Sequence, residues 1–289
     1  MEDRVGMAKT EGALRGWFRA HGFEEVRTAE VLAAPAPEDY IDAIPAPEGG
    51  WFRTSPELQM KKLLAGGAGP IFQIGPCWRA EEEGRFHRSR FTMLEWYRPD
   101  AGSAEMLADT KSLLAHCARE RFGETRFSWQ GPAISLAEGD WEVLTVQEAF
   151  LRHAGWDPTG KDFDANRFDL DLVGKVEPAL AKDHPVVLRD YPAALAALAR
   201  RNPDGRTADR WEVYVGGIEL ANAYGELTDP AEQRRRFEAT NRFRAARGAE
   251  RYPLDEEFLA VLGRMPPSGG IALGVDRLHM LLSGAPGLQ

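Results

Sequence analysis

The sequence predicts a fold of mixed α and β structure, organised around a long antiparallel hairpin. Two segments rich in aromatic and β-branched residues, 71–79 and 90–98, flank a charged loop that contains Gly84; this pattern is typical of two paired strands and their connection. Residues 210–223 have the character of a further strand, and a Gly-rich strand at 268–274 runs into a helix. No repeat or clear linker divides the chain, so we expect one domain over residues 1–289.

Helices are predicted where apolar residues recur at intervals of three and four. These segments are 10–22, 104–121, 145–153, 193–200, 232–248 and 275–282. A further helix, 55–64, begins at Thr54-Ser55-Pro56-Glu57, which supplies a capping hydroxyl, a proline at the first helical position and an acid in the first turn. Residues 33–50 are rich in Pro and Gly and predict a loop, whereas 156–183 carry no clear pattern.

The composition argues against several functional classes. The chain has 289 residues and a net charge of 36 − 45 = −9, which disfavours broad contact with nucleic-acid phosphates. Cys77 and Cys117 have neither metal-ligand spacing nor a disulfide pattern, so we expect a reducing cytoplasm. The sequence contains no P-loop, dinucleotide fingerprint or zinc spacing, and we expect neither a signal peptide nor a membrane span.

The predicted hairpin carries an unusual set of polar side chains. Because strand side chains alternate between faces, Arg79 and Glu81 are expected on one face, and Phe91, Glu95 and Tyr97 on one face. Burying these groups as plain core would cost several kcal/mol for each unpaired charge. A site that binds a charged, planar molecule is therefore the favoured interpretation.

Two acids in the segment 210–223 suggest a cation site. Glu212 and Glu219 would face opposite sides of an unbroken strand, but Gly216-Gly217 between them could host a bulge that restores a common face. Two carboxylates brought together in this way suit Mg²⁺. Surface acids on an edge strand are an equally good interpretation from the residues alone.

Two charged residues lie in the first turns of predicted helices, and their interpretations differ. Arg277 lies in the first turn of its helix, where a cation opposes the helix dipole, so a bound or fixed anion is expected nearby. Glu57 also lies in a first turn, where compensation of the dipole by itself explains a carboxylate.

Several stretches resemble class II aminoacyl-tRNA synthetases. Arg79-Ala-Glu81, His87 and Phe91-Thr-Met-Leu-Glu95 are similar to their motif 2, and Gly270-Ile-Ala-Leu-Gly-Val-Asp-Arg277 is similar to their motif 3. Thr54-Ser-Pro-Glu57, Phe91-Thr-Met-Leu-Glu-Trp-Tyr-Arg-Pro and Gly217-Ile-Glu-Leu-Ala-Asn222 narrow the resemblance to the elongation factor P lysine ligases. The resemblance extends from about residue 8 to about residue 284.

The resemblance implies an α+β fold of the class II aminoacyl-tRNA synthetase type, with an antiparallel sheet flanked by helices. It implies a single catalytic domain without an anticodon-binding domain, usually a homodimer in the cytoplasm. It also implies that ATP and Mg²⁺ activate a lysine-like amino acid, (R)-β-lysine, as an adenylate that is transferred to a lysine side chain of elongation factor P. Neither a membrane nor tRNA is an expected partner.

The resemblance also implies roles for individual residues. Arg79 would bridge the substrate carboxylate and the α-phosphate, and Arg277 would lie across adenine near phosphate, so both are expected to be catalytic. ATP contacts are expected from Arg79, Glu81, His87, Phe91, Glu212, Glu219 and Arg277, with Glu212 and Glu219 holding Mg²⁺. The amino-acid pocket is expected to be lined by Ser55, Glu57, Glu95, Tyr97, Asn222, Glu226 and Ala272, of which Glu226 and Tyr97 would hold the distal ammonium.

Two departures from the family pattern are visible. The motif 2 loop usually contains His-Asn-Pro-Glu-Phe, whereas this chain has His87-Arg88-Ser-Arg90-Phe91. Ala29 stands where the motif 1 proline is usual. Arg88 and Arg90 therefore change the charge beside the ATP site or the docking surface for the acceptor.

Two other functions remain open at this point. A lysyl-tRNA synthetase paralogue would pass its adenylate to tRNA or to another carrier, although the acidic charge and the missing anticodon module count against tRNA. A regulatory paralogue would bind an amino acid without catalysis. Against it stands the presence of Arg79, Glu81, Glu212, Glu219 and Arg277.

Overall fold

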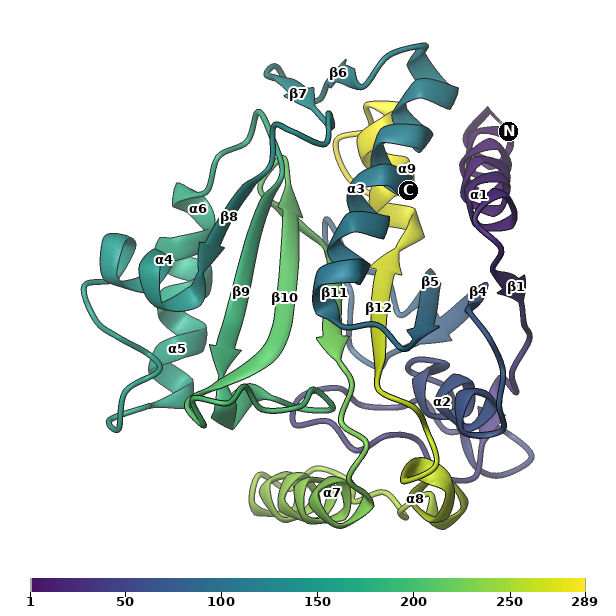
Figure 1. The fold of residues 1–289 in the computed structure, drawn as a ribbon, viewed down its shortest axis with the longest axis vertical. Coiled ribbons are helices and arrows are strands. Elements are labelled where there is room, and N and C mark those ends of the chain that lie inside the picture. Colours follow the sequence, from purple (N-terminus) through teal and green to yellow (C-terminus); the bar gives the residue numbers. More distant parts are fainter. Residues whose placement is uncertain (1, 289) are drawn as a thin grey trace.

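The protein, a computed structural model that describes residues 2–288, is built on one large sheet flanked by helices (Figure 1). The eight strands lie in the order β1 (Glu24–Glu25), β4 (Ile71–Trp78), β5 (Arg90–Pro99), β12 (Ser268–Gly274), β11 (Ile218–Gly225), β10 (Thr207–Val215), β9 (Val186–Pro192) and β8 (Glu142–Thr145). Neighbours from β4 to β9 are antiparallel, whereas both outermost pairs, β1–β4 and β8–β9, are parallel. The predicted α+β class is confirmed, with parallel strands only at the sheet edges.

The predicted hairpin is present as β4 and β5. Their register runs from Ile71 opposite Tyr97 to Trp78 opposite Arg90, so Glu95 and Tyr97 share one face as expected. The prediction that Arg79 and Glu81 lie on the same face of a strand is wrong. The strand ends at Trp78, and Glu81 adopts a left-handed backbone (φ 59°) in the following turn.

The segment 210–223 forms two strands rather than one. Gly216 (φ 63°) and Gly217 (φ 79°) form the tight connection between β10 and β11, which is the backbone that a two-residue hairpin turn requires and that glycine adopts without strain. The register of the pair shifts instead between Val213 and Tyr214 of β10, where β11 contributes the extra residue, Leu220. Glu212 and Glu219 lie on these two neighbouring strands, and both line the same cavity.

Three helices cover one face of the sheet: α1 (Glu2–Ala20), α3 (Ser103–Phe122) and α9 (Val275–Ser283). In Figure 1, α3 crosses the central strands and α1 lies beside it. The alternate residues Leu94 and Trp96 of β5 enter the core beneath these helices, and each is 0% exposed. Glu95 and Tyr97 therefore point to the opposite face.

The remaining helices lie at the ends of the sheet. They are α2 (Glu57–Ala65), α7 (Pro230–Ala246) and α8 (Glu256–Leu262), which pack near one end, and α4 (Val146–His153), α5 (Ala165–Asp171) and α6 (Glu177–Ala179), which lie beside β8 and β9 (Figure 1). A π-helix, Leu172–Val176, joins α5 to α6. The predicted helix at 193–200 is wrong beyond its first turn, since only Ala193–Leu195 is helical, as a 3₁₀ turn.

Two short strand pairs complete the described part of the fold. β2 (Val31–Leu32) pairs with β3 (Trp51–Phe52), and β6 (Arg126–Ser128) pairs with β7 (Ala133–Ser135). Among the described residues, no helix combines the length and the apolar character that crossing a bilayer requires.

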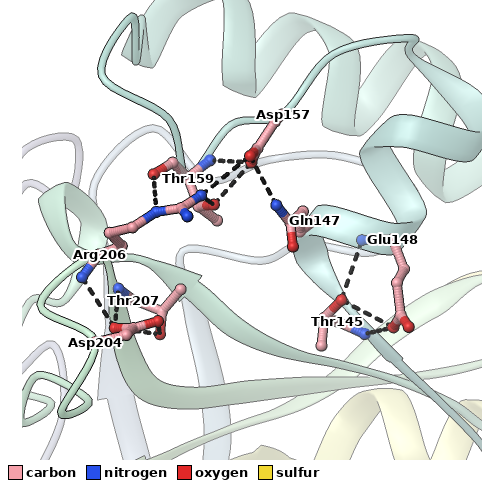
Figure 2. A network of polar contacts seen from close by, with 8 residues as sticks. All are labelled: Thr145, Gln147, Glu148, Asp157, Thr159, Asp204, Arg206 and Thr207. Atoms are coloured by element: carbon pink, nitrogen blue, oxygen red, sulfur yellow. Dashed lines mark hydrogen bonds and ion pairs between the residues drawn. The ribbon is translucent and has the colours of Figure 1, made fainter.

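A polar network fastens the α4–α6 region to the sheet (Figure 2). The guanidinium of Arg206 donates to Thr159 Oγ1 at 2.6 Å and to Asp157 Oδ2 at 3.1 Å, and Gln147 Nε2 donates to the same Asp157 oxygen at 2.7 Å. These contacts join the turn before β10 to the loop that follows α4. None of these four residues lines the cavities described below.

Candidate active site

The sheet face opposite α3 holds a cavity of about 450 Å³ over the central strands. β5, β12, β11 and β10 all contribute to its floor, since every second residue of each strand faces it. Phe91, Ala272 and Asn222 line it from three of these strands, and the loop after β4 closes one side with Arg79 and His87. Segments far apart in the sequence therefore form one concave surface.

Several basic side chains line this cavity. Arg277 Nη1 donates to the Glu219 carbonyl at 2.6 Å, and its Nη2 lies 2.7 Å from His87 Nε2. The Arg79 guanidinium lies over the Phe91 ring, with its carbon 5.1 Å from the ring centroid. Partial burial and the Arg277 charge lower the pKa of His87. Positive groups beside an open aromatic ring suit a nucleotide with its phosphates.

Arg79 is held charged by nearby acids. Burial alone would lower the pKa of Arg79, but the carboxylates of Glu38 and Glu82 more than offset this and raise it. The Glu82 carboxylate lies 3.6 Å from the guanidinium. The buried Nε of Arg79 has no hydrogen-bond partner within the described residues, so this N–H group remains available to donate to a ligand.

Glu212 and Glu219 line the same cavity, but their carboxylates differ in how accessible they are to a bound cation. Glu212 accepts from Tyr191 at 2.6 Å, from Tyr214 at 2.9 Å and from Arg210 at 2.5 Å. The Glu219 side chain is 41% exposed and lies 3.5 Å from Arg277. Desolvation and the Glu212 charge raise the pKa of Glu219. Glu219 is thus the carboxylate open to a cation.

The two acids fit magnesium as part of a shared site. Within the described residues, no group of three or more His, Cys, Asp or Glu side chains forms a complete metal cage. Mg²⁺ is commonly bound through one or two carboxylates together with substrate phosphates. The pair Glu212 and Glu219 matches that arrangement when phosphates occupy the cavity.

A second, smaller cavity of about 70 Å³ continues from the first and is lined by carboxylates. Ser55 Oγ donates to Glu95 Oε1 at 2.6 Å, and Tyr97 Oη donates to Glu95 Oε2 at 2.8 Å. The Ser55 hydroxyl also accepts from the Glu57 amide at 2.9 Å. The first turn of α2 therefore places Ser55 and Glu57 against β5, where dipole compensation is only part of the role of Glu57.

A buried lysine lies among these acids. Lys61 Nζ is 2.5 Å from Glu57 Oε1 and 2.5 Å from Glu226 Oε2, and its side chain is 1% exposed. These carboxylates raise the pKa of Lys61 against the effect of burial. Glu226, predicted to hold a substrate ammonium, is thus already in contact with an ammonium of the chain itself.

The pocket retains acceptor oxygens without donors, and burial raises the pKa of two of its carboxyl groups. Glu226, which is 3% exposed, contacts Lys61 through Oε2, whereas its Oε1 and Asn222 Oδ1 have no donor within the described residues. Burial raises the pKa of Glu226 to about 8, although Lys61 opposes the shift. Burial and the Glu57 charge raise that of Glu95 to about 7. A cationic ligand would supply the missing donors and favour both ionised forms.

Two small residues of β12 shape the floor of the pocket. A methyl group on Gly270 would lie 2.1 Å from Glu226 Oε1 and 2.3 Å from Tyr97 Cε1, so only glycine fits there. Ala272 lies opposite Glu95 on one side and Asn222 on the other. Its methyl group separates the acidic pocket from the larger cavity.

Comparisons with known proteins agree with this geometry. The family model described as tRNA synthetases class II (D, K and N) matches residues 7–289. A protein of Hamiltonella defensa named elongation factor P–(R)-β-lysine ligase is 41% identical over 262 residues, which cover 83% of this chain and 75% of that protein. A ligase of the same name from Proteus mirabilis is 37% identical over 309 residues, covering 96% and 90%. The chain belongs to this family of class II ligases.

The family's motif 2 loop takes an unexpected course in this chain. Glu81 is exposed and does not line the cavity, whereas Glu82 does. Arg88 donates to the Gly84 carbonyl at 2.6 Å and also to the Leu288 carbonyl, so it closes the loop on itself and on the C-terminal segment. Arg90 is exposed at the start of β5.

Sequence reasoning missed several residues of this class II ligase site. Lys61 follows Glu57 by four positions in a predicted helix, and this spacing could have indicated the ion pair. Arg210 contacts Glu212 from two residues away, on the same strand face. Glu38 lines both cavities from the loop 33–50, where no periodic pattern marks an inward-facing residue.

A larger cavity of about 860 Å³ lies elsewhere, beside the N-terminus of α3. Four of its charged residues already form ion pairs with one another: Arg200 lies 2.7 Å from Asp209, and Arg189 lies 2.7 Å from Asp190. Size alone therefore does not mark the active site.

Proposed function

We propose that this protein activates (R)-β-lysine, or a closely related diamino acid, with ATP and transfers it to a lysine side chain of elongation factor P. The observation that carries the proposal is the junction of a cation-lined cavity with a carboxylate-lined pocket, with Arg79 between them. The names of the related ligases support the identity of the amino acid and of the acceptor.

The larger cavity would bind ATP. Phe91 and Arg277 both line this cavity and are proposed to hold adenine between them, and His87, beside Arg277, would contact the terminal phosphates. Arg79 would contact both the α-phosphate and the substrate carboxylate, because a guanidinium can donate to two anions at once. Glu81 is proposed as a ligand of the adenine amino group on the family resemblance.

Magnesium would be held by Glu219 and Glu212 together with the phosphates. When bound, it neutralises phosphate charge as pyrophosphate leaves. The two arginines stabilise the same developing charge from the protein side.

The acidic pocket would bind the diamino acid. Asn222 Oδ1 and Glu226 Oε1 are the acceptors without donors, and they point to the distal ammonium. Glu95, fixed by Ser55 and Tyr97, supplies further negative charge. Glu57 sets the position of Lys61, and Ala272 shapes the passage between pocket and cavity.

The reaction would proceed in two steps. An oxygen of the substrate carboxylate attacks the α-phosphorus, the bond to the β-phosphate oxygen breaks, and pyrophosphate leaves. The acceptor lysine amine then attacks the acyl carbon, an amide bond forms, a proton is lost and AMP leaves. Positioning and charge stabilisation account for catalysis, since no side chain acts as a nucleophile.

The assembly and location are also proposals. We propose a homodimer in the cytoplasm, in line with the family resemblance, and no tRNA substrate. The net charge of −9 supports the last point. Light scattering tests the dimer, and aminoacylation of total tRNA tests the exclusion of tRNA.

The direct experiment combines the protein with ATP, Mg²⁺, (R)-β-lysine and elongation factor P, and measures the mass of the factor. Addition of one β-lysyl group is expected, and Arg79→Ala should abolish it. Arg235→Ala, which changes an exposed arginine paired only with Glu232, is the matched control and should remain active. An unmodified factor with the wild-type protein, under conditions where a related ligase works, would refute the proposal.

The assignment of Glu81 needs its own pair of variants. If Glu81 contacts adenine, Glu81→Gln should raise the KM for ATP more than Glu82→Gln does. The opposite order would assign the role to Glu82, which lines the cavity.

A further inference from the structure

The two cavities meet at a small set of shared residues. These are Glu38, Arg79, Met93, Asn222, Tyr224 and Ala272. Among them, Arg79 is the one guanidinium and Glu38 the one carboxylate. The junction of the cavities thus presents one positive and one negative group.

This pair matches the reacting end of an amino acid. A free amino acid carries a carboxylate and, one or two carbons away, an ammonium. Arg79 is complementary to the carboxylate. The ammonium beside it requires an anionic or carbonyl acceptor, because an unpaired charge in a cavity costs several kcal/mol.

The other carboxylates of the pocket are less available for this ammonium. Glu57 is in contact with buried Lys61 at 2.5 Å, and both oxygens of Glu95 accept from hydroxyl groups. By contrast, the carboxylate of Glu38 makes no hydrogen bond or ion pair within residues 5–288, the part of the chain with described side chains. The Glu38 side chain is half-buried and lines both cavities, and desolvation raises its pKa to about 7, although the charge of Arg79 opposes the shift.

The loop that carries Glu38 is firmly anchored. Arg244 of α7, 0% exposed, donates to the Glu38 carbonyl at 2.7 Å and to the Ile41 carbonyl at 2.9 Å, and its Nη2 contacts Asp42 at 2.5 Å. Ala80 beyond β4 donates to the Asp42 carbonyl at 2.7 Å. The backbone of Glu38 is therefore fixed relative to Arg79.

A separate observation indicates that a ligand with donors belongs here. Glu226 and Asn222 keep acceptor oxygens without donors in the same pocket, and Glu226 is only 3% exposed. Glu226 lines the smaller cavity and not the larger one, so it lies away from the junction and is proposed to bind the distal ammonium, whereas Asn222 lies at the junction itself. One diamino acid with its carboxylate at Arg79 would satisfy both ends.

We propose that Glu38 binds the amino group nearest the reacting carboxylate and thereby selects diamino acids over amino acids that lack this group. This assignment rests on the proposed function and adds a specificity-determining residue to it. Glu38 acts on binding of the amino acid and has no part in the transfer of the phosphoryl or acyl group.

The test compares three substrates in ATP–pyrophosphate exchange: (R)-β-lysine, lysine and 6-aminohexanoate. The last keeps the carboxylate and the distal ammonium but lacks the amino group near the carboxylate. Glu38→Gln keeps the shape and removes the charge. It should lower kcat/KM for the preferred diamino acid about 10- to 100-fold, the usual effect of losing a charged hydrogen-bond partner, and change that for 6-aminohexanoate less than about threefold.

Glu48→Gln is the matched control, because it makes the same change at an exposed position of the same loop; it should leave all three values unchanged. Equal losses for all three substrates in Glu38→Gln would overturn the proposal, since Glu38 would then act through Arg79 or the fold. Absence of exchange in the wild-type protein with every substrate would refute the proposed function instead. The Glu38 assignment would then be decided by calorimetric binding of the same amino acids, and equal affinities in wild type and variant would overturn it.

Discussion

Replacing Lys61 by methionine gives the sharpest test of the acidic pocket. Lys61 is 1% exposed and lies 2.5 Å from both Glu57 and Glu226. Removing one partner of a buried ion pair leaves an uncompensated charge and costs about 3–5 kcal/mol. For a protein of this size, that corresponds to a melting temperature lowered by roughly 6–20 °C.

Lys62→Met provides the matched control on the next residue. The Lys62 side chain is 16% exposed and contacts Glu257, which is 79% exposed, at 2.7 Å; Asp255 lies 2.9 Å away. The pair with Glu257 is open to solvent and contributes about 1 kcal/mol or less, and the Asp255 side chain, 9% exposed, faces an ammonium that is itself partly exposed. Lys61→Met should therefore be the more destabilising of the two variants when unfolding is followed in urea.

The Lys61→Met effect should also depend on pH. Below about pH 7, Glu226 is protonated in both proteins, because its folded-state pKa is about 8 with Lys61 present, and only the Glu57 contact is lost. Above about pH 8, Glu226 ionises in the wild type beside Lys61, whereas in the variant ionisation is opposed by burial without a counter-ion. The difference in unfolding free energy should widen between pH 6 and pH 9. Equal losses in the two lysine variants, or a difference that narrows with pH, would refute this account of the pocket.

Three further predictions follow from the site and its surroundings. Burial raises the pKa values of Glu95 and Glu226 to about 7 and about 8, so KM for the diamino acid should fall as pH rises from 6 to 8.5. The free energy of unfolding should decline over the same range as these acids lose their protons. A KM that rises with pH would contradict the assignment. Glu219→Gln should raise the Mg²⁺ concentration that gives half-maximal exchange, because it removes the carboxylate open to the metal, and an unchanged requirement would exclude Glu219 as a ligand. Arg206→Ala should lower stability by about 1–3 kcal/mol through loss of its contacts to Thr159 and Asp157, yet leave substrate preference unchanged in kinetic assays.

Local patterns in the sequence predicted the elements that position the site. The hairpin β4–β5 follows from alternating side chains on both sides of a charged loop, and the face that carries Glu95 and Tyr97 follows from the same alternation. The start of α2 follows from Ser55-Pro56-Glu57, and the structure adds that this turn brings Ser55 to Glu95. Such features depend on neighbours within a few residues, which sequence patterns record.

Errors arose where distant contacts decide the structure. An Ala/Leu-rich segment predicted a helix at 193–200, but Arg200 and its neighbours instead bond to β11 and β10, as in the Arg200 amide donating to the Gly225 carbonyl at 2.8 Å. Glu38 was missed because its loop is held by Arg244, more than 200 residues away. Gly216-Gly217 was interpreted as a bulge because a glycine pair is compatible with a bulge and with a two-residue turn alike.

The position of β12 has a consequence for biosynthesis. This strand is inserted between β5 and β11, so the two hairpins made earlier, β4–β5 and β10–β11, cannot join into one sheet until residue 274 has left the ribosome. Pairings this distant in sequence form late, because the intervening chain must first be ordered. A nascent chain that lacks β12 would hold Arg79 and Glu226 on separate pieces of the sheet, so the two adjoining cavities could not form before this strand has been made.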